Sequence, residues 1–228
     1  MNQEKSGLIM KEILERIEAY LNDFNQDHGT DFAIDTIRID YQKQYKKEAL
    51  DSLGKWHKVT PSSNISAKLK KRLKDDEITS AYQFERENIY YFNKKDPIKK
   101  KYRHSVMVIF GMKQYTSSAP NTHTVKSILN ILKDVSEIDV CFDIPIPPNL
   151  EELSKRFNLT PYKDSVYINT PNIQMIEKVL IYNKALKNGL NAPLWRIEFK
   201  VTIPNARDLA IPLYEMKKEI IDLTKGNG

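Results

Sequence analysis

Three segments of the chain alternate apolar and ionisable side chains residue by residue, and this alternation constrains the fold more than any other feature. The segments are SEIDVCFDIPI (136–146), EKVLIYNK (177–184) and LWRIEFKV (194–201). Successive side chains of a β-strand point to opposite faces of a sheet, so the alternation predicts strands with one buried and one polar face. An antiparallel sheet can leave one face open to solvent or ligand. We therefore expect an antiparallel sheet with one open polar face.

Helices are predicted around these strands. Apolar residues recur at helical spacing in 7–24, in 124–135, after Asn149 as a candidate N-cap, and in 205–223, where we expect a bend at Pro212. Shorter alternating runs predict further strands at 31–42, 104–111 and 165–171. This order of elements is typical of an α+β fold whose mainly antiparallel sheet is covered by helices.

We treat residues 1–228 as a single domain with a core at 30–203. The polar, lysine-rich range 42–80 is interpreted as a basic surface excursion with a helical segment inside it.

Several classes of protein are excluded or disfavoured. No apolar stretch approaches the roughly 20 residues that span a bilayer, and the N-terminus alternates charged and apolar residues where a secretory signal needs an apolar core. A single cysteine, Cys141, allows no internal disulfide, and no CxxC pair is present for zinc. We expect a soluble protein of the reducing cytoplasm, without a membrane partner.

The distribution of charge favours a polyanionic partner. The net charge is +6, and the basic residues gather in two runs, AKLKKRLK (67–74) and KKDPIKKKYR (94–103), with the aromatic run IYYF (89–92) between them. Lysines contact phosphates and exposed tyrosines can stack on unpaired bases, so the runs are candidate DNA-binding segments. The alternative is ordinary solvated surface. The candidate DNA-binding residues are Lys68, Lys70, Lys71, Arg72, Lys99, Lys100, Lys101 and Arg103.

The polar sides of the three alternating strands carry residues suited to phosphodiester chemistry. Asp139, Asp143 and Glu198 offer the oxygen ligands that Mg²⁺ or Mn²⁺ prefers. Tyr182 offers a hydroxyl nucleophile. The alternative is that this is the wet face of a half-exposed sheet, on which the carboxylates pair with basic residues.

Positive charge lies on the same strands. Lys184, Arg196 and Lys200 could stabilise a phosphate and its more negative transition state.

The order and spacing of these segments carry a family resemblance. EIDVCFDIPI followed by LIYNKALKNGLNAPLWRIEFKV is similar to the paired signature of Rep_trans-type rolling-circle replication initiation proteins and related conjugative relaxases, in which an IDxxxD-like strand precedes YxK and RxE strands. The upstream segments DTIRIDY and VMVIFGMKQY follow in a similar order, and the resemblance covers most of 30–203. One departure is that Ala185, Leu186 and Lys187 stand where an acidic residue often follows the YxK strand.

The resemblance implies roles for individual residues. Asp139, Asp143 and Glu198 would serve the metal site, and Lys184 and Arg196 would contact the phosphate. A tyrosine would attack DNA and leave a 5′-phosphotyrosine with a free 3′-hydroxyl. Tyr182 and Tyr167 both qualify as this nucleophile, and we rank Tyr182 first because it shares a strand face with Lys184.

The function implied by the resemblance is sequence-specific DNA nicking and strand transfer, by a relaxase-like nickase of a plasmid or another mobile genetic element. Its partner would be origin DNA, single-stranded or in a hairpin, with a helicase and a second copy of the chain as further partners to consider. Two alternatives stay open: a non-catalytic origin-binding protein on the same fold, and a metal-dependent nuclease in which water replaces the tyrosine.

Overall fold

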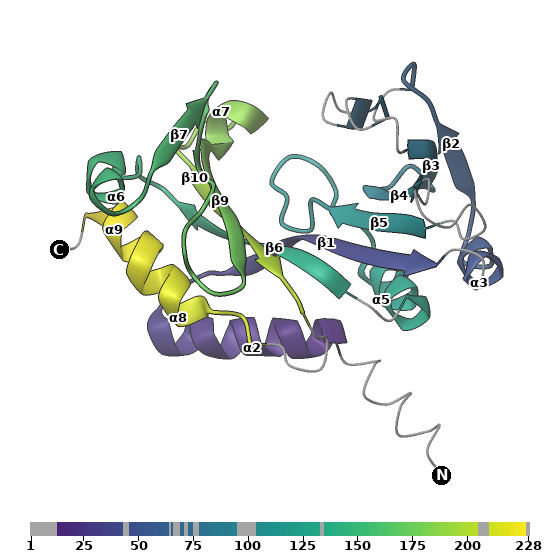
Figure 1. The fold of residues 1–228 in the computed structure, drawn as a ribbon, viewed down its shortest axis with the longest axis horizontal. Helices are drawn as coiled ribbons and strands as arrows, with labels where there is room; N and C mark the ends of the chain where they lie inside the picture. Colours follow the sequence, from purple (N-terminus) through teal and green to yellow (C-terminus); the bar gives the residue numbers. More distant parts are fainter. Residues whose placement is uncertain are drawn as a thin grey trace, which may run out of the picture. The chain divides into compact units, whose positions relative to one another are not determined.

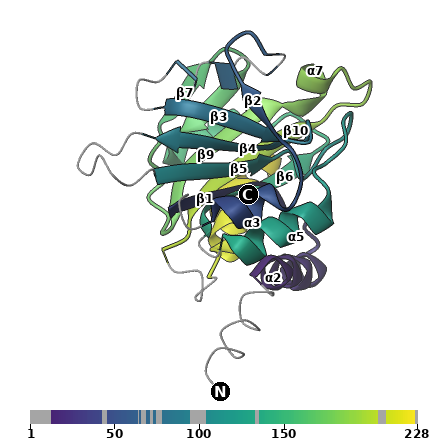
Figure 2. The ribbon, with the colours of Figure 1, turned by 90° about the vertical axis from the view of Figure 1, so that its right-hand side faces the viewer.

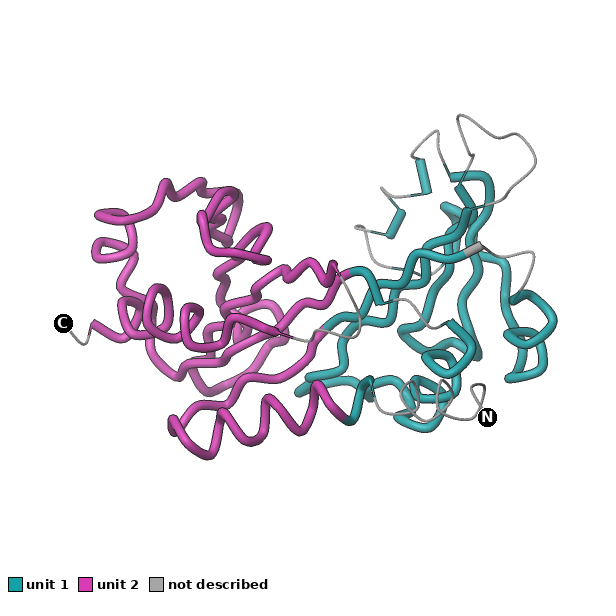
Figure 3. The backbone as a smooth tube through the Cα atoms, turned by 60° about the horizontal axis from the view of Figure 1, so that its bottom comes forward, with its two compact units in different colours: residues 1–15, 36–136 teal, residues 16–35, 137–228 magenta. Residues whose placement is uncertain are grey.

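The computed structural model describes residues 13–42, 46–63, 65, 69–70, 73–74, 78–94, 104–132, 135–204 and 210–226. The chain divides into two compact units, residues 1–15 and 36–136 (unit 1) and residues 16–35 and 137–228 (unit 2) (Figure 3). Each unit contains antiparallel strands and helices, so the predicted α+β class with a mainly antiparallel sheet is confirmed.

Unit 1 is built on five strands in the order β2-β3-β4-β5-β1. Their bounds are β1 (Ala33–Gln42), β2 (Trp56–Val59), β3 (Ile78–Phe84), β4 (Ile89–Lys94) and β5 (His104–Phe110), and the helices are α3 (Lys47–Asp51) and α5 (Thr122–Ile131). All the pairings among these strands are antiparallel. β1 starts in unit 2, because the division between the units falls after Asp35.

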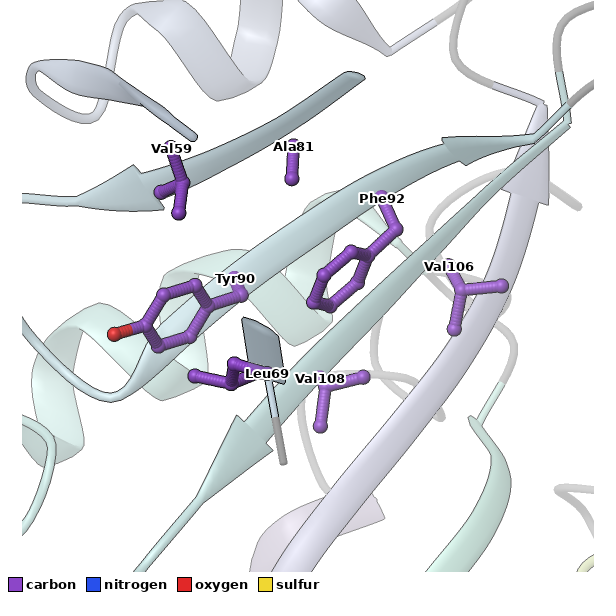
Figure 4. Close-up of a cluster of buried hydrophobic side chains, with 7 residues drawn as sticks. All are labelled: Val59, Leu69, Ala81, Tyr90, Phe92, Val106 and Val108. Atoms are coloured by element: carbon purple, nitrogen blue, oxygen red, sulfur yellow. The ribbon is translucent and has the colours of Figure 1, made fainter. Parts of the chain in front are cut away.

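The range 42–80 is more structured than we expected from its polarity. It contains α3, β2 and the start of β3, and its apolar residues Leu50, Val59 and Leu69 are buried. Leu69 belongs to a core cluster with Val59, Ala81, Tyr90, Phe92, Val106 and Val108 (Figure 4). Scattered apolar residues thus anchor a segment whose average composition is that of a loop.

The aromatic run IYYF is core, and the idea that its tyrosines are exposed for base stacking is wrong. Tyr90, Tyr91 and Phe92 are at most 4% exposed. β4 lies between β3 and β5, and the ring of Tyr91 packs against Trp56 while Tyr90 faces the cluster of Figure 4. A central strand that is buried on both faces carries a continuous apolar run, and IYYF is such a run. The lysines on either side of it in the sequence do not make it a surface segment.

Unit 2 is built on five antiparallel strands in the order β6-β10-β9-β8-β7. Their bounds are β6 (Val135–Ile144), β7 (Leu159–Tyr162), β8 (Ser165–Ile168), β9 (Ile176–Asn183) and β10 (Trp195–Thr202). The helices are α2 (Ile13–His28), α6 (Leu150–Arg156), α7 (Lys184–Asn188), α8 (Leu213–Met216), the π-helix η2 (Lys217–Ile221) and α9 (Asp222–Lys225). α2 and β6 have their first residues in unit 1.

One face of these strands is covered. Phe32, which follows α2, packs its ring 5.0 Å from that of Phe142 and 6.2 Å from that of Phe199. α2 and α8 run beside each other (Figure 1), and the Tyr20 hydroxyl of α2 donates to the Ile211 carbonyl just before α8. Since Phe142 and Phe199 lie on the apolar side of the alternation, the ionisable side is the opposite face.

The C-terminal helix differs from the prediction at its start. Pro212 precedes the first helical residue, Leu213, so the expected bend at Pro212 is wrong; residues 205–209 lie outside the described part. Proline is tolerated at a helix start because it has no amide hydrogen to donate. The predicted cap of α6 is confirmed, since the Asn149 side chain accepts from the Glu152 amide.

None of the helices in the described ranges is both long and apolar enough to cross a membrane.

Candidate active site on the polar face of unit 2

The strand register brings the ionisable residues of unit 2 onto one face. Arg196 lies opposite Asp143 on β6 and opposite Tyr182 on β9, and Lys200 lies opposite Asp139. Residues directly opposite each other in an antiparallel ladder point to the same side of the sheet. Glu198 lies two residues after Arg196 and two before Lys200 on the same strand, so its side chain points to the same side of the sheet. β6, β10 and β9 are labelled beside one another in Figure 1, whereas Figure 2 shows the succession of β3, β4, β5 and β1 in unit 1.

Tyr182 and Glu198 form a direct pair at the centre of this face. The Tyr182 hydroxyl donates to Glu198 Oε1 at 2.5 Å. Burial and the neighbouring Glu198 charge raise the pKa of Tyr182. Burial raises the pKa of Glu198 as well, assisted by the charge of Asp35 and opposed by the Tyr182 hydrogen bond. Burial therefore disfavours the charged form of each group, and the Tyr182 hydroxyl is the donor that stabilises Glu198 when it is ionised.

Arg196 is completely buried and is held by two carboxylates. Its Nε and Nη2 donate to the two oxygens of Asp143 at 2.7 and 2.9 Å, and its Nη1 donates to Asp35 Oδ1 at 2.8 Å. Burial opposes the charge of Arg196, but these hydrogen bonds outweigh it and raise its pKa. All three bonds lie within the protein, so contact between Arg196 and a phosphate stays a prediction.

Asp35 is a site residue that the sequence reasoning missed. It lies at the start of β1, and burial raises its pKa although the charges of Arg196 and Lys184 counteract this. The sequence did contain a signal, because Asp35 alternates in step with Ile37 and Ile39 on the apolar side of its strand. An isolated carboxylate among core positions indicates a buried cationic partner.

Lys184 lies close to Tyr182, but on a helix rather than on the predicted strand. β9 ends at Asn183, whose side chain accepts from the Leu186 amide and caps α7. Lys184 is 4% exposed, and its Nζ lies 6.0 Å from the centre of the Tyr182 ring. Burial and the Arg196 charge lower the pKa of Lys184.

Lys187 was not predicted as a site residue. It lies one helical turn after Lys184, and its Nζ is 4.6 Å from the centre of the Tyr182 ring. Residues three apart in a helix share a face, and this spacing was the available signal.

Tyr167, the second candidate nucleophile, lies on the same face. It is on β8 opposite Leu180, and Lys178 Nζ lies 4.3 Å above its ring. Tyr167 is half-buried, and burial together with Tyr162 and Glu198 raises its pKa. The choice between Tyr182 and Tyr167 stays open.

The three carboxylates predicted to bind a metal do not fit a cation as the side chains stand. Asp143 is bonded to Arg196, and Glu198 accepts from Tyr182. Within the described ranges, no three His, Cys, Asp or Glu side chains group closely enough to hold a metal ion. The predicted use of Mg²⁺ or Mn²⁺ therefore stays a prediction.

Of the predicted DNA-binding residues, the described part of the chain contains Lys70. Lys70 is half-buried next to Leu69 of the core cluster in unit 1. The other seven predicted DNA-binding residues lie outside the described residues: Lys68, Lys71, Arg72, Lys99, Lys100, Lys101 and Arg103. Cys141 is fully buried, as expected for a cysteine that behaves as a small apolar residue.

Among the comparisons with known proteins, only those with solved structures give matches. No protein-family model matches the chain, and no curated protein matches it either. Among solved structures, the chain is similar to a rolling circle replication initiator protein from Geobacillus stearothermophilus, with 10% sequence identity and a TM-score of 0.46 over 78% of this chain and 76% of that chain.

Proposed function

We propose that this protein nicks DNA with a tyrosine nucleophile and transfers the cut strand, as the first step of rolling-circle replication or of the transfer of a mobile element. The proposal rests on the order of the IDxxxD-like, YxK and RxE segments in the sequence. One structural observation carries it further, the hydrogen bond from the Tyr182 hydroxyl to Glu198.

This hydrogen bond supplies the geometry of a nucleophile and its base. The acceptor atom of a general base must lie within about 2.6–3.2 Å of the atom that carries the proton. The Tyr182 hydroxyl oxygen and Glu198 Oε1 are 2.5 Å apart, so they meet this condition. The raised pKa of Glu198 makes it a better proton acceptor than an exposed carboxylate. The raised pKa of Tyr182 keeps the phenol protonated until a phosphate is in place.

The proposed reaction is balanced by these groups, the DNA and water. The phenol oxygen forms a bond to phosphorus, and its proton passes to Glu198. The bond between phosphorus and the 3′-oxygen breaks, and that oxygen leaves as a hydroxyl after taking up a proton from water, while Glu198 keeps the proton of the phenol. Lys184 and Lys187, which lie beside the Tyr182 ring, stabilise the negative charge that develops at the phosphate.

The assay that tests the proposal contains a divalent cation. Mg²⁺ or Mn²⁺ would lower the charge of the phosphate during attack. Asp139 and Glu198 share the polar face with the nucleophile, but binding of a cation requires their side chains to rearrange, so none of the steps above depends on the metal.

A second candidate function is binding of origin DNA without cutting. One observation favours it, since Arg196, Asp143 and Asp35 satisfy one another in a buried network. Such a network can serve the stability of the sheet alone.

The test is a search for the covalent intermediate. Single-stranded oligonucleotides that tile the DNA around the chain's own coding sequence are labelled at the side 3′ of each candidate cut and incubated with the protein and Mg²⁺ or Mn²⁺. A tyrosine nucleophile is expected to leave a labelled protein band on a denaturing gel, and Tyr182→Phe is expected to abolish it. Tyr167→Phe is the matched control, because it removes a hydroxyl from the same face.

Each outcome has a distinct meaning. If only Tyr167→Phe abolishes the band, the mechanism stands with the other nucleophile. Cleavage by both variants without any band means that water attacks and the protein is a nuclease. Binding without cleavage of any oligonucleotide, with either cation, leaves the DNA-binding candidate.

A further inference from the structure

The polar face of unit 2 continues beyond Tyr182 to the hairpin of β7 and β8. Tyr162 lies opposite Ser165, and Ser165 lies opposite Tyr182. The three side chains therefore lie in one row across neighbouring strands. Strands are about 4.8 Å apart, so Tyr162 is roughly 10 Å from Tyr182. This edge of the sheet is within reach of a DNA strand whose phosphate sits at Tyr182.

The hairpin presents an aromatic surface to solvent. Tyr162 is 61% exposed, in contrast to the buried tyrosines of β4. Its ring meets the ring of Tyr167 edge-on at 6.5 Å, so the two rings form a small angled surface. A single exposed aromatic side chain is ordinary on a protein surface, so the inference rests on the position of Tyr162 beside Tyr167 and in the row of Tyr182.

Lysines surround this aromatic surface. Lys163 Nζ lies 5.6 Å from the centre of the Tyr162 ring, and Lys178 Nζ lies 4.3 Å from that of Tyr167. Asp164 in the hairpin turn, Glu177 and Glu198 are the nearby acidic residues; the Glu177 carboxylate is paired with Lys200, and Glu198 accepts from Tyr182. Two lysines thus lie at the two rings, where their ammonium groups can contact the phosphates of a bound strand.

The tip of the hairpin is a two-residue turn formed by Lys163 and Asp164. Lys163 has a φ of 52°, a left-handed conformation in which glycine would cost less. The favoured two-residue hairpin turns need a positive φ, so the turn itself accounts for this conformation. Here it holds a lysine beside the exposed ring.

We propose that the β7–β8 hairpin is a stacking platform for unpaired bases of the DNA strand that passes the candidate active site. Tyr162 stacks on a base, the ring of Tyr167 supports its edge, and Lys163 and Lys178 contact the adjoining phosphates. Every base has a π-face and every nucleotide a charge, so this surface holds single strands of any sequence. The choice of DNA as the partner rests on the proposed function.

Binding to single-stranded oligonucleotides tests the platform. The probe is a mixed-sequence strand with one 2-aminopurine, whose fluorescence falls when its base stacks on an aromatic ring. Tyr162→Ala is expected to weaken binding by roughly 5- to 150-fold, the range that corresponds to losing one stacked base, and to abolish the quenching. Tyr162→Phe keeps the ring and is expected to retain both.

Tyr214→Ala is the matched control for exposure. Tyr214 is 57% exposed, but it lies on α8 with its ring 6.5 Å from that of His28 of α2, among the helices opposite the polar face. Its replacement is expected to leave binding and quenching unchanged. Equal losses in Tyr162→Ala and Tyr214→Ala, or none in either, would overturn the proposal.

Further probes separate the platform from other partners and from the proposed function. A fully paired duplex of the same sequence and a strand of abasic nucleotides are both expected to be insensitive to Tyr162→Ala, because neither offers an unpaired base. Equal sensitivity with the duplex would overturn the proposal. If the protein stacks on the single strand but forms no adduct, only the nickase proposal fails. If Tyr162→Ala binds the strand with full affinity and still cuts it, only the platform proposal fails.

Discussion

Glu198 illustrates how a single residue can be costly for folding and useful for chemistry. Its carboxylate lies in a poorly solvated place, and burial and the charge of Asp35 raise its pKa. A buried ionised carboxylate is unfavourable unless it is fully paired, and Glu198 has the Tyr182 hydroxyl as its donor. Arg196 shows the opposite balance, since its hydrogen bonds to Asp143 and Asp35 outweigh the cost of burial.

We predict that Glu198→Gln stabilises the protein at neutral and alkaline pH. A raised folded-state pKa means that the native state holds the proton to higher pH than the unfolded state does, so stability falls as pH rises through this interval. Glutamine removes the charge and can still accept from Tyr182. The melting temperature of Glu198→Gln should match that of the wild type below about pH 4, where the unfolded carboxyl is also protonated, and should exceed it by a growing margin as the pH rises above that value. An advantage that grows as the pH falls would contradict the raised pKa.

At the scale of elements, α7 determines where the cations of the site lie. Asn183 ends β9 and caps α7, and Lys184 and Lys187 follow one turn apart beside the Tyr182 ring. Gly189 ends the helix with a φ of 63°, which glycine adopts without strain. A five-residue helix has little stability of its own, so these two ends position its lysines.

We predict that Asn183→Ala impairs DNA cleavage more than its effect on stability explains. Loss of an N-cap costs about 0.5–2 kcal/mol, and the freed helix start displaces Lys184 and Lys187. Asn149→Ala is the matched control, because Asn149 caps α6 in the same manner. Urea unfolding should show similar losses for both variants, while the rate of adduct formation should fall only for Asn183→Ala. Equal rates in the two variants would show that α7 does not position the site.

The elements with a clear period were predictable from the sequence. The strands β6, β9 and β10 and the register that gathers their ionisable sides follow from strict alternation, because polar and apolar positions must separate onto two faces. β2 and β7 were missed, because β2 lies in the polar range 42–80 and β7 contains Pro161, which argues against a strand except at the edge of a sheet. Lys184 was assigned to a strand because alternation continues through it, although the Asn183 cap starts a helix there.

Only those residues of the site that lie on alternating strands could be predicted from the sequence. Tyr182, Glu198, Asp139 and Asp143 share a face because they lie on neighbouring strands of one sheet. The partners of Arg196 were not predictable, since Asp35 is 161 residues away in the chain and only the fold brings the two together. The exposed aromatic platform was sought in β4 and lies instead at Tyr162, because exposure depends on whether a strand is central or at an edge.

At the scale of the whole molecule, two kinds of contact with DNA are expected to separate. The net charge is +6, and much of the excess lies in the runs 67–74 and 94–103 of unit 1. The aromatic platform and the Tyr182–Glu198 pair belong to unit 2. Phosphate contacts position a strand without reading its sequence, whereas stacking requires unpaired bases. Salt should therefore weaken the first kind of contact and largely spare the second.

We predict that the basic runs contribute a salt-dependent, sequence-independent part of the affinity for DNA. Replacing Lys99, Lys100 and Lys101 by Gln should weaken binding to every oligonucleotide, because fewer counterions are released when the strand binds. In a plot of log affinity against log salt, the slope for single strands should become shallower by roughly 0.7 for each phosphate that the variant no longer neutralises. Tyr162→Ala serves as the comparison, since it should lower the affinity without changing the slope. An unchanged slope in the triple variant would show that this run is ordinary solvated surface, as its composition alone also allows.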